Sequence, residues 1–429
     1  MSKFARVAIV TLALAAHAPI AQASPCAGTA VPTAVSNLSD NVLTVDALLN
    51  RIRSLSPAVL SAGLEARALS AEADQASRRL NPVLSFEAEN FAGGGRFSGF
   101  GETETTLALE QTFRLGNKRT LSERAARARQ ALASAECEVI LRETELEATL
   151  MLAELVSAKT LKDLAKSNAT LAQQLTEIVG RRVEAGAAAP PELMRARADA
   201  ARAKAQVEAA GLEIERLRSA LGLLWAEANP RFHVPGTLSF GTDSSHLDRS
   251  TSHPATARAE AALAVRRAEA DEARSAALPD VTVSAGIRRF EESGDQAFIA
   301  GLSVPLPIFD RGRDRSRATS IRSEIALLDQ ARSKRRLIAD QTIAISARRV
   351  AQSRLTILED QALPAAAEAY RAAVRGYEIG RFDLTTTLNA RTAYLDAQLA
   401  VARARHELTI QDLRLRALSG AAPFDGAIQ

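Results

Sequence analysis

The sequence predicts a mainly α-helical protein with a small β part, in which one structural unit occurs twice. The stretch that begins at Pro57 reappears at Pro254, an offset of 197 residues (254 − 57). Pro82 and Pro279 repeat that offset (279 − 82). Aromatic residues make up only 4% of the chain, while Ala, Leu, Arg and Glu dominate, which is typical of long helices packed through small side chains. Each copy reads as helix, two strands, long helix, helix, and such a repeat excludes most enzyme folds.

The N-terminus has the pattern of an export signal. A basic start precedes an apolar run, and residues 21–23 read Ala-Gln-Ala, a small-residue cleavage site. We therefore expect residues 1–23 to be a signal peptide and the mature chain to begin at Ser24. A lipoprotein with Cys26 as the acylated residue is the alternative, which Pro25 directly before the cysteine disfavours.

The mature chain contains two cysteines, Cys26 and Cys137. In an oxidising periplasm these residues can form a disulfide. Two unpaired thiols, with Cys137 as a small residue on a helix face, are the alternative. The sequence leaves both possibilities open.

Composition and motifs exclude several classes of function. The net charge is +4, and the basic residues are interleaved with acids, which argues against a nucleic-acid surface. The histidines of the mature chain lack paired ligand spacing, so we assign no metal site. Because no nucleophile-base-acid set and no phosphate-binding glycine loop occurs, we expect neither a cofactor nor an enzyme.

The first copy, residues 24–225, begins with two helix signals. A short helix is predicted over 44–53 with Thr44 as its cap. A second helix is predicted over 57–80, because Ser56 is a favoured N-cap and proline is favoured at the first helical position.

Two amphipathic strands follow, at 82–92 and 103–113. A glycine-rich stretch separates them, which predicts a hairpin. Alternation puts apolar side chains on one face of the first strand and polar side chains on the other: Leu84, Phe86 and Ala88 against Ser85, Glu87 and Glu89.

A helical hairpin is predicted over 117–222. Residues 118–179 contain no Gly and no Pro, so at 1.5 Å per residue they would form a helix roughly 90–100 Å long. Gly180 and Gly186 end this helix, and Pro190 starts the return helix. Apolar residues recur at spacings of three and four in both helices, the pattern of a coiled coil.

The second copy, residues 253–420, follows a linker at 226–252 and repeats these elements. We expect Pro364 to bend its long helix, because proline removes a helical hydrogen bond near Asp360. The predicted elements are strands at 280–289 and 297–308, a helical hairpin at 313–418 and a loose tail at 421–429.

The four strands are about ten residues long, the length that a tilted strand needs to cross a bilayer. Four strands cannot close a barrel, and lipid does not tolerate open strand edges. We therefore expect several chains to share one membrane wall. The helical hairpins would hang from the strands on one side and form a long tube.

The chain resembles the TolC-like outer-membrane efflux family. The likeness lies in the two-fold repeat, the strand-to-helix turns at 109–119 and 304–315, and the tips VEAG and YEIG. The resemblance implies a homotrimer with four strands per chain in a shared 12-stranded β-barrel, above a long periplasmic α-helical barrel. Within the family, the chain is most similar to the outer-membrane component of cobalt–zinc–cadmium-type heavy-metal RND efflux systems.

The resemblance also implies a function and partners. The protein would give passive exit, across the outer membrane of a Gram-negative bacterium, to heavy-metal cations. An inner-membrane RND pump would deliver them through a periplasmic membrane-fusion adaptor. The same fold as an exit duct for drugs or secreted polypeptides is one alternative. A periplasmic coiled-coil adaptor that never enters a membrane is the other, which the four membrane-length strands disfavour.

The resemblance places a gate and an adaptor-docking site at the two helical tips. Glu192 matches the gate's acidic residue and Tyr377 its tyrosine, while Arg381 lies close to the expected arginine position, which Phe382 occupies. Thr386 and Asn389 stand where the family has a ring of aspartates. The alternative is that the tip glycines only cap helices. The implied docking residues are Val183, Glu184, Ala185, Gly186, Tyr377, Glu378, Ile379 and Gly380.

Basic residues gather where the long helices begin. Positive charge there opposes the helix dipole, which suggests an anionic partner. Phospholipid head groups of the outer membrane are one candidate and simple solvation is the alternative. The residues are Lys118, Arg119, Arg313, Arg315 and Arg317.

Overall fold

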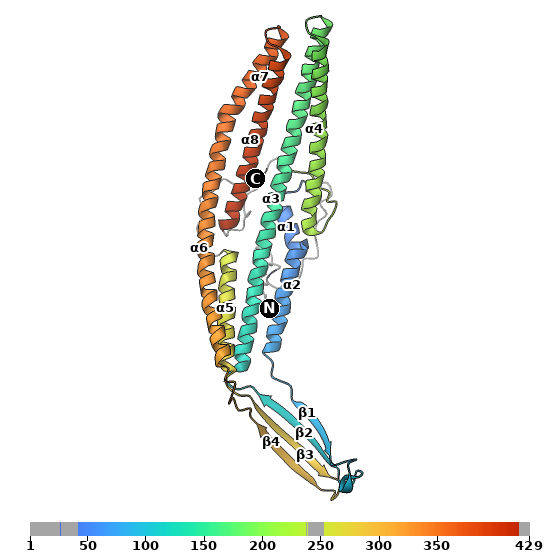
Figure 1. The fold of residues 1–429 in the computed structure, drawn as a ribbon, viewed down its shortest axis with the longest axis vertical. Coiled ribbons are helices and arrows are strands. Elements are labelled where there is room, and N and C mark those ends of the chain that lie inside the picture. Colours follow the sequence, from blue (N-terminus) through green and yellow to red (C-terminus); the bar gives the residue numbers. More distant parts are fainter. Residues whose placement is uncertain (1–25, 27–41, 237, 239–252, 420–429) are drawn as a thin grey trace, which may run out of the picture.

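The computed structural model describes residues 26, 42–236, 238 and 253–419. The expected signal peptide, most of the linker and the C-terminal tail lie outside these residues. The molecule is elongated, with helices along most of its length and a four-stranded sheet projecting from one end (Figure 1). The mainly α-helical fold with a β part is therefore confirmed.

Two helices lead into the sheet. Helix α1 spans Val45–Leu55, and the Thr44 hydroxyl accepts a hydrogen bond from the Ala47 amide at 3.2 Å, as a capping residue should. Helix α2 spans Pro57–Ala76 and ends four residues before the predicted position 80 (80 − 76). The early end has a local reason, because Pro82 disfavours helical geometry in the residue before it and the chain must become extended there.

The sheet joins the two copies of the repeat. All neighbouring strands are antiparallel, in the order β1-β2-β3-β4, and the central pair β2–β3 links the first copy to the second over ten residue pairs. The last strand ends before the predicted position 308, because Pro305 and Pro307 lack the amide hydrogen that a strand ladder needs. The strands are β1 Val83–Glu89, β2 Glu104–Phe113, β3 Val281–Phe290 and β4 Gln296–Ser303.

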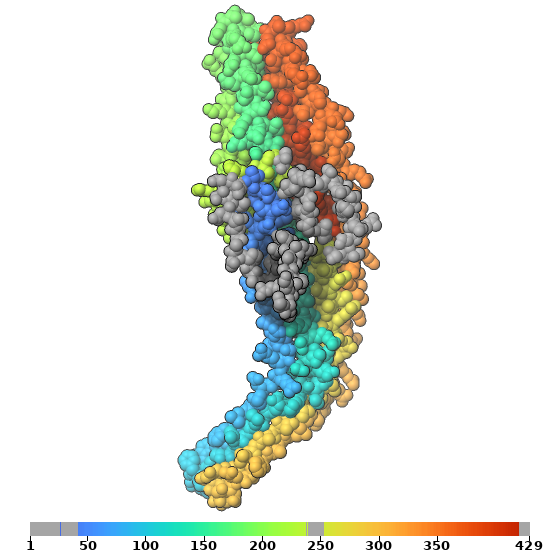
Figure 2. Space-filling model, turned by 180° about the vertical axis from the view of Figure 1, so that it is seen from behind, coloured from blue at the N-terminus to red at the C-terminus, as the bar shows by residue number. Residues whose placement is uncertain are grey.

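One face of this sheet is apolar across all four strands. The register sets Leu84 opposite Leu109, and Ile287 stands between Leu107 and Phe298. These side chains are exposed, with Phe298 91% accessible. No helix is layered on the sheet in either of two opposite views (Figures 1 and 2). The described residues of a single chain therefore leave a continuous apolar surface uncovered.

The opposite face of the sheet is polar. Arg288 forms ion pairs with Glu104 at 2.9 Å and Glu89 at 3.4 Å, and the Thr112 and Thr282 hydroxyls are hydrogen bonded at 2.9 Å. A sheet with one apolar and one polar face suits a wall between lipid and water.

The long helices run from the sheet to the far end of the molecule (Figure 1). In the first copy, α3 continues without a break for 67 residues, about 100 Å at the standard rise. In the second copy a π-helix interrupts the equivalent helix at Leu358–Ala362. Pro364 leaves the carbonyl of Asp360 without its usual donor, so the irregularity falls at the predicted bend. The helices are α3 Lys118–Glu184, α4 Pro190–Gly222, α5 Pro254–Ser275, α6 Arg313–Ile357, α7 Leu363–Glu378 and α8 Leu384–Ser419.

The main hydrophobic core lies midway along the bundle, where α1 packs on α3. Leu48, Ile52, Leu152 and Leu155 are fully buried or nearly so. A disulfide between Cys26 and Cys137 ties the start of the chain to α3 at this level. The disulfide alternative is thus the correct one, and the sulfur of Cys26 is not available for the thioether of a lipoprotein.

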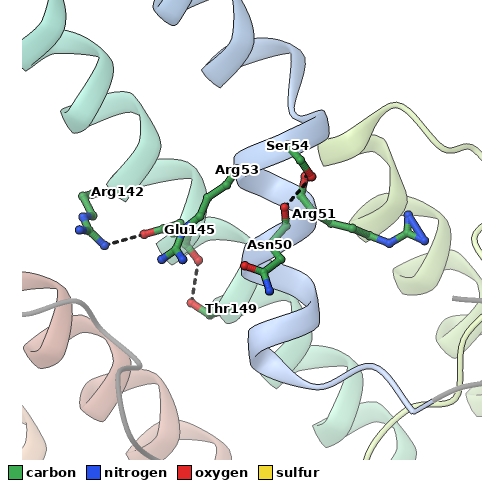
Figure 3. A network of polar contacts seen from close by, with 7 residues as sticks. All are labelled: Asn50, Arg51, Arg53, Ser54, Arg142, Glu145 and Thr149. Atoms are coloured by element: carbon green, nitrogen blue, oxygen red, sulfur yellow. Dashed lines mark hydrogen bonds and ion pairs between the residues drawn. The ribbon is translucent and has the colours of Figure 1, made fainter. Parts of the chain in front are cut away.

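A buried carboxylate sits beside this core. The Glu145 side chain is fully buried and accepts hydrogen bonds from Arg53 Nε at 2.6 Å and from Arg142 Nη1 at 2.9 Å. The Thr149 hydroxyl bonds the Glu145 carbonyl at 3.0 Å (Figure 3). Because two guanidinium groups balance one carboxylate, the charge is paired and its hydrogen bonds are satisfied.

Within the described ranges, no helix combines the length and the hydropathy that crossing a bilayer requires.

Candidate functional site

The two helical tips lie together at the end of the molecule opposite the sheet (Figure 1). The first tip joins α3 to α4 through residues 185–189, and the second joins α7 to α8 through residues 379–383. Side chains from the two tips form one small core, separate from the main one. Its fully or nearly buried members are Leu175, Val179, Ala196, Tyr377, Leu384 and Leu388.

The first tip reverses through a glycine in the left-handed region. Gly186 has φ +71°, and its amide donates to the Val183 carbonyl at 3.0 Å. The next amide, of Ala187, reaches back to the Arg182 carbonyl at 2.8 Å. These two bonds are the pattern of a Schellman cap, which satisfies carbonyls at the end of a helix.

The second tip repeats this cap. Gly380 has φ +76°, its amide donates to the Tyr377 carbonyl at 3.0 Å, and the Arg381 amide donates to the Gly376 carbonyl at 2.7 Å. The glycines therefore cap helices in both copies. Capping alone does not explain the side-chain contacts between the tips.

Tyr377 is the centre of those contacts. Its side chain comes from α7 and is buried, with 2% of the residue accessible. The Tyr377 hydroxyl donates to Glu192 Oε2 at 3.0 Å, across from one hairpin to the other. Burial and the neighbouring Glu192 carboxylate raise the pKa of Tyr377 to about 12, so the hydroxyl stays a donor at any physiological pH.

Arg182 approaches Tyr377 from the last turn of α3. The guanidinium carbon lies 4.6 Å from the centre of the Tyr377 ring. Nη1 donates to the Tyr377 carbonyl, and Nη2 donates to the Ala187 carbonyl at 3.0 Å. One arginine of the first tip therefore contacts the ring and the backbone of the second.

A second set of polar contacts lies beside the tips. Arg391 of α8 is buried and forms an ion pair with Asp199 of α4. Arg195 Nη1 donates to the Thr385 hydroxyl at 3.1 Å. Both contacts join the first hairpin to the second, as those of Tyr377 do.

The structure brings together two of the five predicted gate residues, Glu192 and Tyr377. Arg381, Thr386 and Asn389 are exposed at the second tip. The Thr386 amide donates to Asp383 Oδ1 at 2.8 Å, so this part of the tip caps α8.

Sequence reasoning missed Arg182, Asp199 and Arg391. A usable signal existed for Arg391, which lies three residues before Tyr394, where apolar residues begin to recur at spacings of three and four along α8 (394 − 391). A charged residue in line with such a pattern needs a partner. No comparable pattern marks Arg182, because its contacts depend on how the two tips approach each other.

The predicted docking residues divide by exposure. Most are exposed or half-buried at the tips, and Ile379 is 71% accessible. Tyr377 is the exception, because its side chain is turned into the chain. In this arrangement of the tips, the Tyr377 side chain is not exposed for docking.

Of the predicted lipid-contacting residues, two have partners within the chain and three are exposed. Lys118 Nζ forms an ion pair with Asp280 at 2.7 Å, and Arg119 Nη1 donates to the Ser77 carbonyl at 3.1 Å. These two basic groups thus have partners within the chain. Arg313, Arg315 and Arg317 are exposed at the start of α6.

The comparisons with known proteins agree with this architecture. Residues 234–421 match the family described as outer membrane efflux protein. The whole fold matches the outer membrane protein VceC of Vibrio cholerae with a TM-score of 0.74, over 88% of this chain and 96% of that one, at 20% identity. The match over residues 234–421 shows that the second half of the chain is similar to the outer membrane efflux protein family. The resemblance to TolC-like channels, the fold class and the outer-membrane localisation are confirmed, and the adaptor alternative is not supported.

Two relatives of this chain carry names that refer to metals. The cobalt-zinc-cadmium resistance protein CzcC of Cupriavidus metallidurans is 27% identical over 313 residues, 69% of this chain and 72% of CzcC. The nickel and cobalt resistance protein CnrC of the same organism is 30% identical over 280 residues, 62% of this chain and 64% of CnrC. The matched part is a little under two thirds of CnrC.

Proposed function

We propose that this protein is the trimeric outer-membrane exit duct of a tripartite heavy-metal efflux system. The observation that carries the proposal is the sheet, which has an uncovered apolar face and unpaired outer edges on β1 and β4. Three such sheets supply twelve strands. Pairing β4 of one chain with β1 of the neighbouring chain removes every open strand edge.

The helices support the same closure. Ile343 and Val350 of α6 are 65% and 69% accessible in the single chain. A stripe of this kind on a long helix is expected to be covered by another helix. In the neighbouring chain of the trimer, the exposed side of the first repeat, formed by α2 and α4, is a suitable partner.

Heavy-metal cations are the proposed cargo. The support is the likeness to CzcC and CnrC, whose names refer to resistance to cobalt, zinc, cadmium and nickel. The described residues hold no cluster of three or more metal-ligating side chains. Selection of the cargo is therefore assigned to the inner-membrane RND pump, and this protein provides the passage.

The tips are the proposed contact with a periplasmic adaptor. Glu184, Ala185 and Gly186 of the first tip and Glu378, Ile379 and Gly380 of the second are exposed at the end farthest from the sheet. The bond between Tyr377 and Glu192 is proposed to keep the tube closed until the adaptor docks. At the other end, Arg313, Arg315 and Arg317 are proposed to meet anionic phospholipid head groups.

Reconstitution tests the channel. The mature protein is extracted from membranes with detergent, its mass is measured by light scattering, and it is inserted into planar lipid bilayers. We expect a trimer that adds stepwise conductance. A water-soluble monomer that adds no conductance would refute the duct.

Growth tests the cargo. A strain that lacks the gene is grown on cobalt, zinc and cadmium salts and on a panel of drugs, with and without the gene restored. We expect restored growth on the metals. Restoration on drugs alone would favour the drug-export alternative.

A further inference from the structure

We propose that Arg182 is the latch that holds the two tips together in the closed tube. The inference deepens the proposed function, because it concerns how that duct is kept shut. Neither the family pattern at the tips nor the acid–tyrosine pair accounts for this residue.

The contacts of Arg182 differ from those of an ordinary surface arginine. The guanidinium covers the ring of Tyr377 at 4.6 Å and donates to two carbonyls, one on each tip. The Tyr377 carbonyl is also the acceptor of the Gly380 amide, so Arg182 binds the cap of the second helix itself. One side chain thus joins both turns.

Arginine suits this position for a geometric reason. Its planar group carries several donors in fixed directions and can stack on an aromatic face while donating at its edge. A lysine has one compact charge and cannot make the ring contact and both carbonyl contacts in the same way.

The second tip provides no equivalent cation. Arg381 is exposed, and its side chain makes no hydrogen bond or ion pair with the residues that the structure describes. Phe382 occupies the expected arginine position, and its ring packs so closely against Gly376 that a Cβ atom on residue 376 would collide with the ring. The guanidinium at this closure therefore comes from the first hairpin.

The consequence is a clamp on one residue. Arg182 holds Tyr377 by its ring and carbonyl, and Glu192 holds it by its hydroxyl, and both come from the first hairpin. When α7 and α8 move away from α3 and α4, all of these contacts must break together. Arg182 therefore lowers the population of the open tube.

The test compares two neighbouring arginines in the full-length protein in planar bilayers. Arg182→Gln removes the latch, and Arg182→Lys keeps the charge without the planar group. Arg181→Gln is the matched control, because Arg181 is exposed on the same turn. We expect open probability to rise about 10-fold or more with glutamine, since charged hydrogen bonds and a cation–π contact are lost. Lysine should give an intermediate rise and the control none.

An Arg182→Gln protein that is as closed as the Arg181→Gln protein would overturn the latch. Equal thermal unfolding of the two variants shows that an increased leak does not arise from misfolding. An equal leak in both variants would also count against the latch, because it would point to general loss of positive charge at the tip.

A second measurement keeps the latch separate from the duct. Glu184→Cys and Glu378→Cys are exposed positions, one on each tip, that accept spin labels. The native cysteines are disulfide bonded and do not react. We expect Arg182→Gln to broaden and lengthen the label distance, even if the wild-type protein conducts no current. Absence of wild-type current refutes the duct, whereas an unchanged distance refutes the latch.

Discussion

The two long helices of the repeat occupy very different surroundings. In the first copy, α3 lies inside the chain, with α1, α2 and α4 on one side and α5 and α8 on the other. In the second copy, α6 contacts α5 and α8 and has only three buried residues along 45. Positions at equal distance from the two helix starts show the contrast. Leu155 of α3 is fully buried, whereas Val350 of α6 is 69% accessible (155 − 118 = 350 − 313).

The difference teaches that α6 lacks, within one chain, the second set of neighbouring helices that α3 already has. Both helices occupy the same place in the repeat, yet only α3 is packed between helices on both sides within one chain. In a closed tube, α2 and α4 of the neighbouring chain would pack against α6 in the way that α5 and α8 pack against α3 within one chain. The exposed apolar side chains of α6 are thus the counterpart of a core that already exists in the first copy.

The largest expected effect comes from charging the free side of α6. Ile343→Asp with Val350→Asp should abolish the trimer, because burial of each side chain contributes about 1.5–3 kcal/mol at every seam. Light scattering in detergent measures the mass. Ile343→Leu with Val350→Leu is the control and should stay trimeric. A charged variant that remains trimeric would break the comparison between α6 and α3.

The next effect separates a buried carboxylate of α3 from an exposed one of α6. Glu145→Ala should lower the free energy of unfolding by about 1–3 kcal/mol, since it removes the buried carboxylate that accepts hydrogen bonds from both Arg53 and Arg142. Asp340 lies equally far from the start of its own helix (145 − 118 = 340 − 313) and forms a partly exposed ion pair with Arg336 at 3.7 Å.

Asp340→Ala should therefore cost under about 0.5 kcal/mol. Denaturant unfolding followed by circular dichroism compares the two variants. Equal losses would show that α6 and α3 are not as different as their burial indicates.

A smaller effect concerns the joint between the hairpins. Tyr377→Phe with Glu192→Ala removes a hydrogen bond from a hydroxyl to a carboxylate, a contact of about 1.5–3 kcal/mol. The closed tube should become leakier, by about 10-fold in open probability. Single-channel recording measures this, and an unchanged open probability would contradict a role for the pair in closure.

The smallest effect compares the starts of α2 and α5. Ser56 and His253 hold the same N-cap position, but only His253 uses its side chain, whose Nδ1 accepts from the Ala255 amide at 3.1 Å. Burial lowers the pKa of His253 below the ordinary 6.5, so the folded protein binds this proton less readily than the unfolded chain.

The cap is therefore complete above pH 6.5 and is lost as the pH falls below that value. After correction for the pH dependence of intrinsic amide exchange, the protection factors in the first turn of α5 should fall between pH 7 and pH 5, by under about 1 kcal/mol of opening free energy. His253→Ser should remove this pH dependence. A pH dependence that persists in the serine variant would assign it to another group.

Much of the fold could be predicted because its signals are local. The alternation in 83–89, the prolines at helix starts and the glycines at the tips each act within a few residues. Tyr377 and Glu192 were found through a resemblance, not through spacing. Arg182 and the pair of Asp199 and Arg391 escaped, because such contacts depend on the packing of hairpins nearly 200 residues apart. The end of β4 at Ser303 was missed, although Pro305 could have set it.

The pairing of β2 with β3 has a consequence for the assembly of a closed ring. That pairing joins the strands of the first repeat to those of the second, and the two repeats belong to one polypeptide. A polypeptide with only one unit would need twice as many copies to complete the same ring. The covalent connection therefore halves the number of contacts between separate chains that the closed ring requires, and it allows the two halves to differ, one with a buried long helix and the other with a long helix exposed to its neighbour.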